Sequence, residues 1–256
     1  MRRAVLAGLV TVLVGSVTAA AAQEAPRWTL TERDGVRIAH TELQSRAAVI
    51  VRCAARQFSV MLQGVPTPTD RMVVTAIIDG SVDLTNQWWL TDDSAMLMSR
   101  RPARFARGLA AGRTVSLATR SSDGRSWLVE GPLPADRTAL DAVLSACDIP
   151  RTDPRDLREL PGGDGQASTR QPFGWLRPPR GEWPAWASDR NLTEGFVVLS
   201  CITGEAGRLE DCRVESELPM GGGFGREAVR SARQARLQAH SPVGVVVEFE
   251  INYFLR

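Results

Sequence analysis

The stretch GFVVLSCITGEAGRLEDCRV, residues 195–214, decides how the last third of this chain is expected to fold. An apolar run before Gly204 and a second β-prone run after Gly207 flank a short loop. Two such runs around a glycine-containing loop predict a β-hairpin. Antiparallel pairing about this loop places Cys201 opposite Cys212, since one cysteine stands in each of the two runs. We therefore predict a cross-strand disulfide that fixes the register.

Further along the chain, two patterns complete a small domain. Residues 225–237 put small apolar side chains on one face of a helix and arginines on another, which predicts an amphipathic helix. Residues 245–255 alternate strictly between two sets of side chains, which predicts a strand. With a short helix at 183–190, the segment 180–256 is predicted to hold a three-stranded antiparallel sheet and two helices.

This order of elements resembles the C-terminal domain of TonB-type energy transducers, over the chain from Pro178 onward. The residues that carry the resemblance are Trp183-Pro184 followed by Ala187, Gly195-Phe196-Val197-Val198-Leu199, the strand motif Gly207-x-Leu209-x-Asp211-x-x-Val214 and the helix start Phe224-x-x-x-Ala228. The paired cysteines and the Gly-Phe-Gly helix start resemble a subgroup common in alphaproteobacteria. No single motif decides the resemblance, which depends on the order and spacing of all these motifs.

The resemblance implies a binding site for protein. In such a domain the sheet leaves an edge whose N–H and C=O groups can bond an extended peptide of a partner. By resemblance this edge is the closing strand, and its partner-binding residues would be Val246, Glu248, Glu250, Asn252 and Phe254. The alternative for the polar members of this set is a solvated face that discourages aggregation.

A second candidate surface lies on the predicted helix. Arg226, Arg230 and Arg233 form a candidate carboxylate-binding stripe, and plain solvation of the helix is the alternative. The partner that the resemblance implies is an envelope protein, such as the extended peptide of an outer-membrane receptor. The expected function is therefore a non-enzymatic interaction module linked to TonB-dependent transport.

The N-terminus has the form of a secretory signal peptide. Arg2 and Arg3 precede an uncharged apolar stretch at 4–22, which ends in small residues. Cleavage predicts a periplasmic protein of a Gram-negative bacterium. The alternative is an uncleaved inner-membrane anchor, because the stretch could just span a bilayer. A retained anchor would favour an energy transducer for TonB-dependent transmembrane transport, although that family's anchor carries a His and residues 4–22 have none.

Residues 24–150 alternate short apolar runs with turn signals, which predicts a mostly antiparallel β domain with two helices. The predicted strands are 47–52, 58–62, 72–78, 95–98, 115–118 and 127–129, and the predicted helices are 102–111 and 135–147. Helical spacing turns Cys147 inward, where it can reach Cys53 at a strand end. Since an even number of cysteines in an exported protein favours disulfides, we predict that these two are bonded.

This first domain bears a fainter likeness to the type VI secretion-associated VasI/TagO proteins and to invasion-associated locus B proteins. The residues that carry it include Val51-Arg52-Cys53, Asp79-Gly80, Trp88 and Asp123-Gly124. The likeness implies an envelope accessory domain. Between the two domains, residues 151–179 are rich in proline and glycine, which predicts a flexible linker. The fold class is therefore predicted to be α+β.

The charge pattern argues against nucleic-acid binding. All 31 basic residues are arginines, 29 acidic residues nearly balance them, and the net charge is +2. No arginine-rich run marks a polyanion-binding segment. The two histidines, His40 and His240, lie far from the cysteines, and no C-x-x-C motif is present, so no metal is predicted.

The remaining motifs favour a protein without catalytic residues or cofactors. No Gly-x-Ser-x-Gly elbow is present, and the glycine run at 221–223 lacks the spacing and the lysine of a phosphate loop. One pattern leaves an alternative open: Asp92-Asp93 stands beside Trp88-Trp89, and paired carboxylates with stacking aromatics suit glycans. A cell-envelope enzyme acting on glycans is therefore the third function considered.

Overall fold

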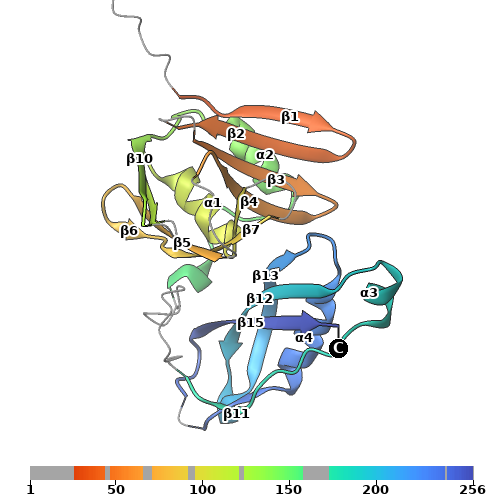
Figure 1. Cartoon of the computed structure of the whole chain (residues 1–256). Coiled ribbons are helices and arrows are strands. Elements are labelled where there is room, and N and C mark those ends of the chain that lie inside the picture. The colour runs from red at the N-terminus through yellow and green to blue at the C-terminus, as the bar shows by residue number, and fades with distance from the viewer. Residues whose placement is uncertain are drawn as a thin grey trace, which may run out of the picture.

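Ten strands in the first half of the chain form one antiparallel sheet that curls around helix α1 (Figure 1). The computed structural model describes residues 26–43, 47–65, 71–91, 96–120, 124–157, 173–239 and 241–255. The strands of this sheet are β1 (Thr29–Arg33), β2 (Val36–Glu42), β3 (Ala48–Ala54), β4 (Gln57–Gln63), β5 (Arg71–Ile78), β6 (Val82–Asp83), β7 (Asn86–Leu90), β8 (Leu97–Ser99), β9 (Thr114–Arg120) and β10 (Ser126–Pro132). Their order is β1-β2-β3-β4-β8-β7-β5-β9-β10, and β6 pairs with β5.

Two-residue turns join the first four strands in pairs. Asp34 and Gly35 lie between β1 and β2 with φ angles of 51° and 74°. Ala55 and Arg56 lie between β3 and β4 with φ angles of 47° and 64°. Positive φ at both central residues matches the right-handed twist of the flanking strands, which is why such turns close tight hairpins.

Two helices complete the core of this half. Helix α1 (Pro102–Ala111) has the predicted bounds and buries Phe105 and Leu109. Helix α2 (Thr138–Ala146) buries Leu140 and Leu144 and packs on β2 and β3. The predicted disulfide between Cys53 and Cys147 is present and ties the end of β3 to the end of α2.

The second half is built on a three-stranded antiparallel sheet of order β13-β12-β15. Its elements are β11 (Trp175–Arg177), α3 (Ala185–Asp189), β12 (Glu194–Thr203), β13 (Leu209–Leu218), α4 (Phe224–Gln234), β14 (Arg236–Leu237) and β15 (Val246–Phe254). Short 3-10 turns stand at Pro154–Leu157 and Glu205–Gly207. Together the two halves give the mixed, mostly antiparallel architecture expected of an α+β chain.

Helix α4 covers one face of this sheet and buries Phe224, Ala228 and Ala232. The ring of Phe224 takes the space beside Gly195, where an added Cβ would lie 2.6 Å from its ring atoms. The glycine that opens β12 is therefore needed for close helix–sheet packing. Cys201 and Cys212 form the predicted cross-strand disulfide on the same face.

Two predictions of local structure are corrected. The helix predicted at 225–237 ends at Gln234, because Arg236–Leu237 leave it to pair with β11. Strands β1 and β2 were not predicted, and every residue of β1 is exposed, so this strand shows no apolar alternation. Strand prediction relies on the alternation of apolar and polar residues, and a fully exposed edge strand does not show it.

Candidate functional site

Strand β15 is one edge of the three-stranded sheet, as the predicted binding edge requires. At its two ends, the N–H of Thr203 donates to Val245 O at 2.9 Å and the N–H of Leu255 donates to Thr193 O at 3.0 Å. The β12–β15 register between these points is unbroken. Since backbone groups of successive residues point to opposite sides of a strand, odd-numbered residues of β15 bond to β12.

The backbone groups of the even-numbered residues therefore point away from the sheet. These residues are the predicted set, Val246, Glu248, Glu250, Asn252 and Phe254. Among the described residues, no strand pairs with β15 on that side. The main chain of the predicted edge is thus oriented as strand addition requires.

The side chains of the same residues divide into two groups along the strand. Val246, Glu248 and Glu250 face the first half of the molecule, and the side chains of the two glutamates are only 9% and 10% exposed. Asn252 and Phe254 are exposed, Phe254 to 54%. The first half of the chain thus covers one end of β15 and leaves the other end open to solvent.

The covered glutamates form two ion pairs with consecutive arginines that precede α1. Arg101 Nε lies 2.6 Å from Glu248 Oε2, and Arg100 Nη2 lies 3.2 Å from Glu250 Oε2. Arg100 also donates to Gln87 Oε1 at 2.7 Å. The alternative of a solvated face is therefore wrong for Glu248 and Glu250. The first domain covers the face of the sheet on which these two side chains lie.

Burial dominates the electrostatics of Glu248. Loss of solvation raises the pKa of this carboxyl, while the charges of Arg101 and Arg100 act in the opposite direction. An unpaired carboxylate at this depth would be costly, which is why each one meets a guanidinium. The two pairs join the first half of the molecule to neighbouring positions of β15.

Apolar contacts surround the ion pairs. Met61, Trp89 and Met98 from the first half pack with Val198 from β12, and all four are at least 96% buried. Phe196 and Leu218 border this cluster. The sheet of the second half is therefore covered on both faces, by α4 on one and by the first domain on the other (Figure 1).

A further arginine joins the halves from within the predicted linker. Arg155 is 7% exposed, donates to Ser200 Oγ at 2.7 Å and pairs with Asp211 Oδ2 at 2.7 Å. Its neighbour Asp156 accepts two hydrogen bonds from Arg107, at 2.6 and 2.7 Å. The start of the segment 151–179 is therefore an ordered part of the interface and not a free coil, and residues 158–172 lie outside the described part.

The arginine stripe of α4 faces solvent along a groove of about 400 Å³, which Val214, Gly225 and Val229 complete. Arg230 pairs with Glu227, on the same helix, and lies 3.6 Å from Glu182. Arg226 and Arg233 are exposed, and neither forms an ion pair with the described residues. The stripe thus contains two solvent-exposed cations.

The N-terminus of α4 is already occupied by a side chain. Glu217 accepts hydrogen bonds from the N–H of Gly223 at 2.6 Å and from the N–H of Gly225 at 2.8 Å. A carboxylate at this position satisfies amides that the helix leaves unbonded and complements its dipole. The anion beside the glycine run at 221–223 is therefore the protein's own Glu217 carboxylate.

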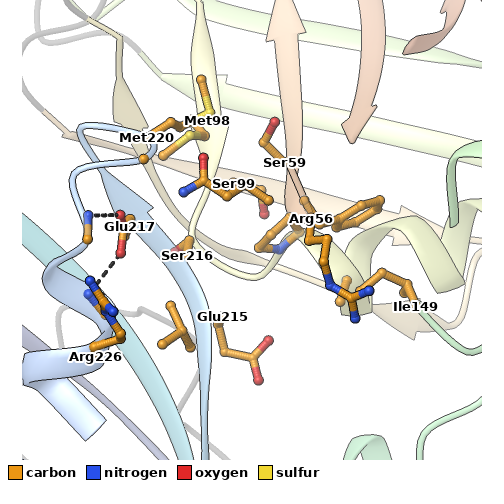
Figure 2. Close-up of a pocket in the computed structure, with 18 residues that line it drawn as sticks. Arg56, Ser59, Met98, Ser99, Ile149, Glu215, Ser216, Glu217, Met220 and Arg226 are labelled. Atoms are coloured by element: carbon orange, nitrogen blue, oxygen red, sulfur yellow. Dashed lines mark hydrogen bonds between the residues drawn. The ribbon is translucent and has the colours of Figure 1, made fainter. Parts of the chain in front are cut away.

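A cavity of about 420 Å³ lies between the halves beside β13 (Figure 2). The first half contributes Phe58, Met98 and Pro102 to its wall, and the second half contributes Val214 and Met220. Its wall is largely apolar, and Arg56, Glu215, Glu217 and Arg226 also line it. No sequence motif indicates this cavity, because its two walls come from different halves of the chain.

Of the residues that suggested a glycan enzyme, only the two tryptophans lie in the described part of the chain. Trp88 and Trp89 are 0% and 2% exposed, so neither ring can stack on a sugar. Asp92 and Asp93 lie outside the described residues, as does His240. Within the described ranges no cluster of three potential metal-ligating side chains is found.

The segment 1–22, on which the export prediction depends, also lies outside the described residues. None of the helices in the described part of the chain is both long and apolar enough to span a membrane. Comparison with protein-family models and with curated proteins finds no match for this chain.

The sequence motifs do not indicate the arginines that join the two halves. Arg100, Arg101 and Arg155 carry most of the polar contacts between the halves, and none of them stands in a recognisable motif. The signal that could have indicated them is weak: Glu248 and Glu250 sit in an otherwise apolar strand and so require buried cations if that face is covered.

Proposed function

We propose that this chain is an exported, non-enzymatic protein-binding module of the TonB C-terminal type, which adds an extended segment of an envelope protein to the edge of β15. The observation that carries the proposal is the orientation of the main chain at Val246, Glu248, Glu250, Asn252 and Phe254. A peptide laid along this edge gains main-chain hydrogen bonds without any rearrangement of the sheet. The open end, around Asn252, is where binding would begin.

The side chains at this end suit a guest with apolar residues. Phe254 and Leu255 are 54% and 52% exposed, and the Phe254 ring lies 6.0 Å from that of Phe196. Exposed apolar side chains beside an unpaired strand edge are unfavourable unless a partner covers them. An outer-membrane receptor segment is the partner that the family resemblance suggests.

The two disulfides support export of the protein to an oxidising compartment. Both disulfides join cysteines that follow the signal-like segment 1–22, and disulfides persist outside the reducing cytosol. The mature N-terminus separates the module from a membrane-anchored energy transducer. Mass spectrometry that finds a start near Gln23 supports the module, whereas a retained Met1 in the inner membrane favours the transducer.

Site-specific crosslinking tests the binding edge. A photoreactive amino acid placed at Phe254 in the native host should capture a protein, and the crosslinked residues should map to one extended segment. The same group at Leu176, which is 73% exposed on β11, serves as the matched control and should not capture that segment.

A backbone variant then tests the mode of binding. Asn252→Pro removes an N–H that points away from β12, so the ladder within the sheet keeps its bonds while the guest loses a donor. Asn252→Ala keeps that donor. Binding of the synthetic segment should be lost in the first and retained in the second, and equal affinities would rule out strand addition at β15.

A further inference from the structure

The opposite edge of the sheet, strand β13, also has outward-facing main chain. Because odd-numbered residues of β12 bond to β15, its even-numbered residues bond to β13. Ser216 and Leu218 are paired with such residues, Val198 and Phe196. Glu217, between them, therefore directs its backbone groups away from the sheet. Within the described ranges no strand pairs with β13 on this side.

The backbone of Val214, further along β13, has the same outward orientation as that of Glu217. A bulge separates it from Ser216, and its partner Leu199 belongs to the set of β12 residues that bond to β15. The backbone of Val214 therefore also points outward. Its side chain is 42% exposed and lies beside Gly225 at the start of α4.

Across the cavity, strand β4 presents a matching edge. It runs past the end of β8, with which only Met61 and Leu62 are paired. Ala54 and Gln57 flank the two-residue turn to β3 and so form a hydrogen-bonded pair. By alternation, the backbone of Phe58 points away from β3 and toward the cavity, whose wall Phe58 lines.

The two sides of β13 differ in chemistry. On the side of the first domain lies the 420 Å³ cavity, whose wall includes Met98 and Met220 (Figure 2). On the side of α4 lies the groove of about 400 Å³ with Arg233, and Arg226 lines both spaces. Successive side chains of a strand point to opposite faces, so a strand added here would send alternate residues into each space.

We infer that the β13 edge is a second peptide-binding site, and that its ligand is an extended segment in which apolar and acidic residues alternate. The apolar side chains fill the cavity between the halves, and the carboxylates meet the two exposed arginines of α4. Two carboxylates also line the cavity, but Glu215 accepts a hydrogen bond from Ser200 Oγ and Glu217 accepts two from backbone N–H groups at the start of α4. Arg226 and Arg233 form no ion pair with the described residues, so charge complementarity selects an acidic segment over a basic one. The site is distinct from the β15 edge and does not depend on it.

Titration of the isotope-labelled full-length mature protein with a defined peptide tests this inference. The probe is a short acetylated and amidated peptide of alternating leucine and glutamate. Its binding should shift the amide signals of Phe58, Val214 and Glu217, and leave those of Asn252 and Phe254 unchanged. No shift at about 1 mM peptide, or shifts confined to β15, would overturn the inference.

A charge swap tests the role of the arginines. Arg226→Glu with Arg233→Glu should weaken binding by about tenfold and should favour a peptide of alternating leucine and lysine. The matched control is Arg177→Glu with Arg208→Glu, two exposed arginines away from the groove, which should leave the preference unchanged. The same preference in both double variants would refute the assignment.

Main-chain pairing is tested on the peptide, so that folding of the protein is not at issue. N-methylation at alternate residues removes the donors on one edge of the peptide while the side chains stay the same. One of the two alternately methylated peptides should lose binding and the other should retain it. If both retain it, the segment does not bind as an added strand.

Discussion

Arg101 and Glu248, separated by well over a hundred residues in the chain, form an ion pair of 2.6 Å with side chains only 7% and 9% exposed. Removing Arg101 takes the nearest cation away from a buried carboxylate. Arg101→Met should therefore destabilise the protein by about 3–5 kcal/mol, and the double variant with Glu248→Met should recover much of that loss. Urea unfolding followed by tryptophan fluorescence measures both effects.

The control for this cycle is an exposed pair. Arg37 Nε lies 2.8 Å from Glu32 Oε1, and their side chains are 44% and 50% exposed. Arg37→Met should cost less than about 1 kcal/mol, because water screens the pair. Equal losses from the two arginine variants would show that burial at the interface does not matter.

The two disulfides should contribute unequally to stability. Cys53 and Cys147 are 94 residues apart, whereas Cys201 and Cys212 are 11 apart. Because a longer loop restricts the unfolded chain more, replacing the first pair by alanine should cost about 4.7 kcal/mol and replacing the second about 3 kcal/mol. Equilibrium unfolding of the two variants checks the order, and a larger loss from the second pair would contradict it.

Glu217 should stabilise the start of α4. Its carboxylate accepts hydrogen bonds from the N–H groups of Gly223 and Gly225. Glu217→Ala should therefore cost about 1–2 kcal/mol, the range of a lost helix cap. Thermal unfolding measures the loss. Glu194→Ala, at an exposed position of β12, is the control and should be close to neutral.

Acid should weaken the contact between Arg155 and Asp211. The hydrogen bond from Arg155 is the main cause that lowers the pKa of Asp211 below its ordinary value of 3.8. The contribution of this group is therefore present above the ordinary pKa and is lost as the pH falls through the lowered value. Asp211→Asn should flatten the decline in stability between about pH 5 and pH 2. Asp189→Asn, at an exposed carboxylate of α3, should leave the decline unchanged.

Local elements could be predicted from the sequence wherever a signal marked both ends. Pro102 and Gly112 bound α1, and the predicted range 102–111 is confirmed. Cys201 and Cys212 stand in the two runs that flank the 204–207 loop, and the disulfide predicted between them is present. In these cases the information lies within a few residues of the element itself.

The cover over the binding edge could not be predicted in the same way. Alternation at 245–255 indicates that two sets of side chains face opposite ways, but not what lies against each set. The positive charges opposite Glu248 and Glu250 belong to Arg101 and Arg100. The position of these arginines depends on how the first domain packs against the sheet. The role of Arg155 in the interface could not be predicted either, because the prolines and glycines around it are typical of a linker.

The buried arginine–glutamate pairs limit how this protein can be recombined. A sheet that has lost the first domain would expose two carboxylates beside the apolar side chains of Phe196, Val198 and Leu218. Fusing the second half to an unrelated partner would therefore require arginines at equivalent points of the new partner. During evolution, the two halves are expected to be inherited as a matched pair and not shuffled as independent modules.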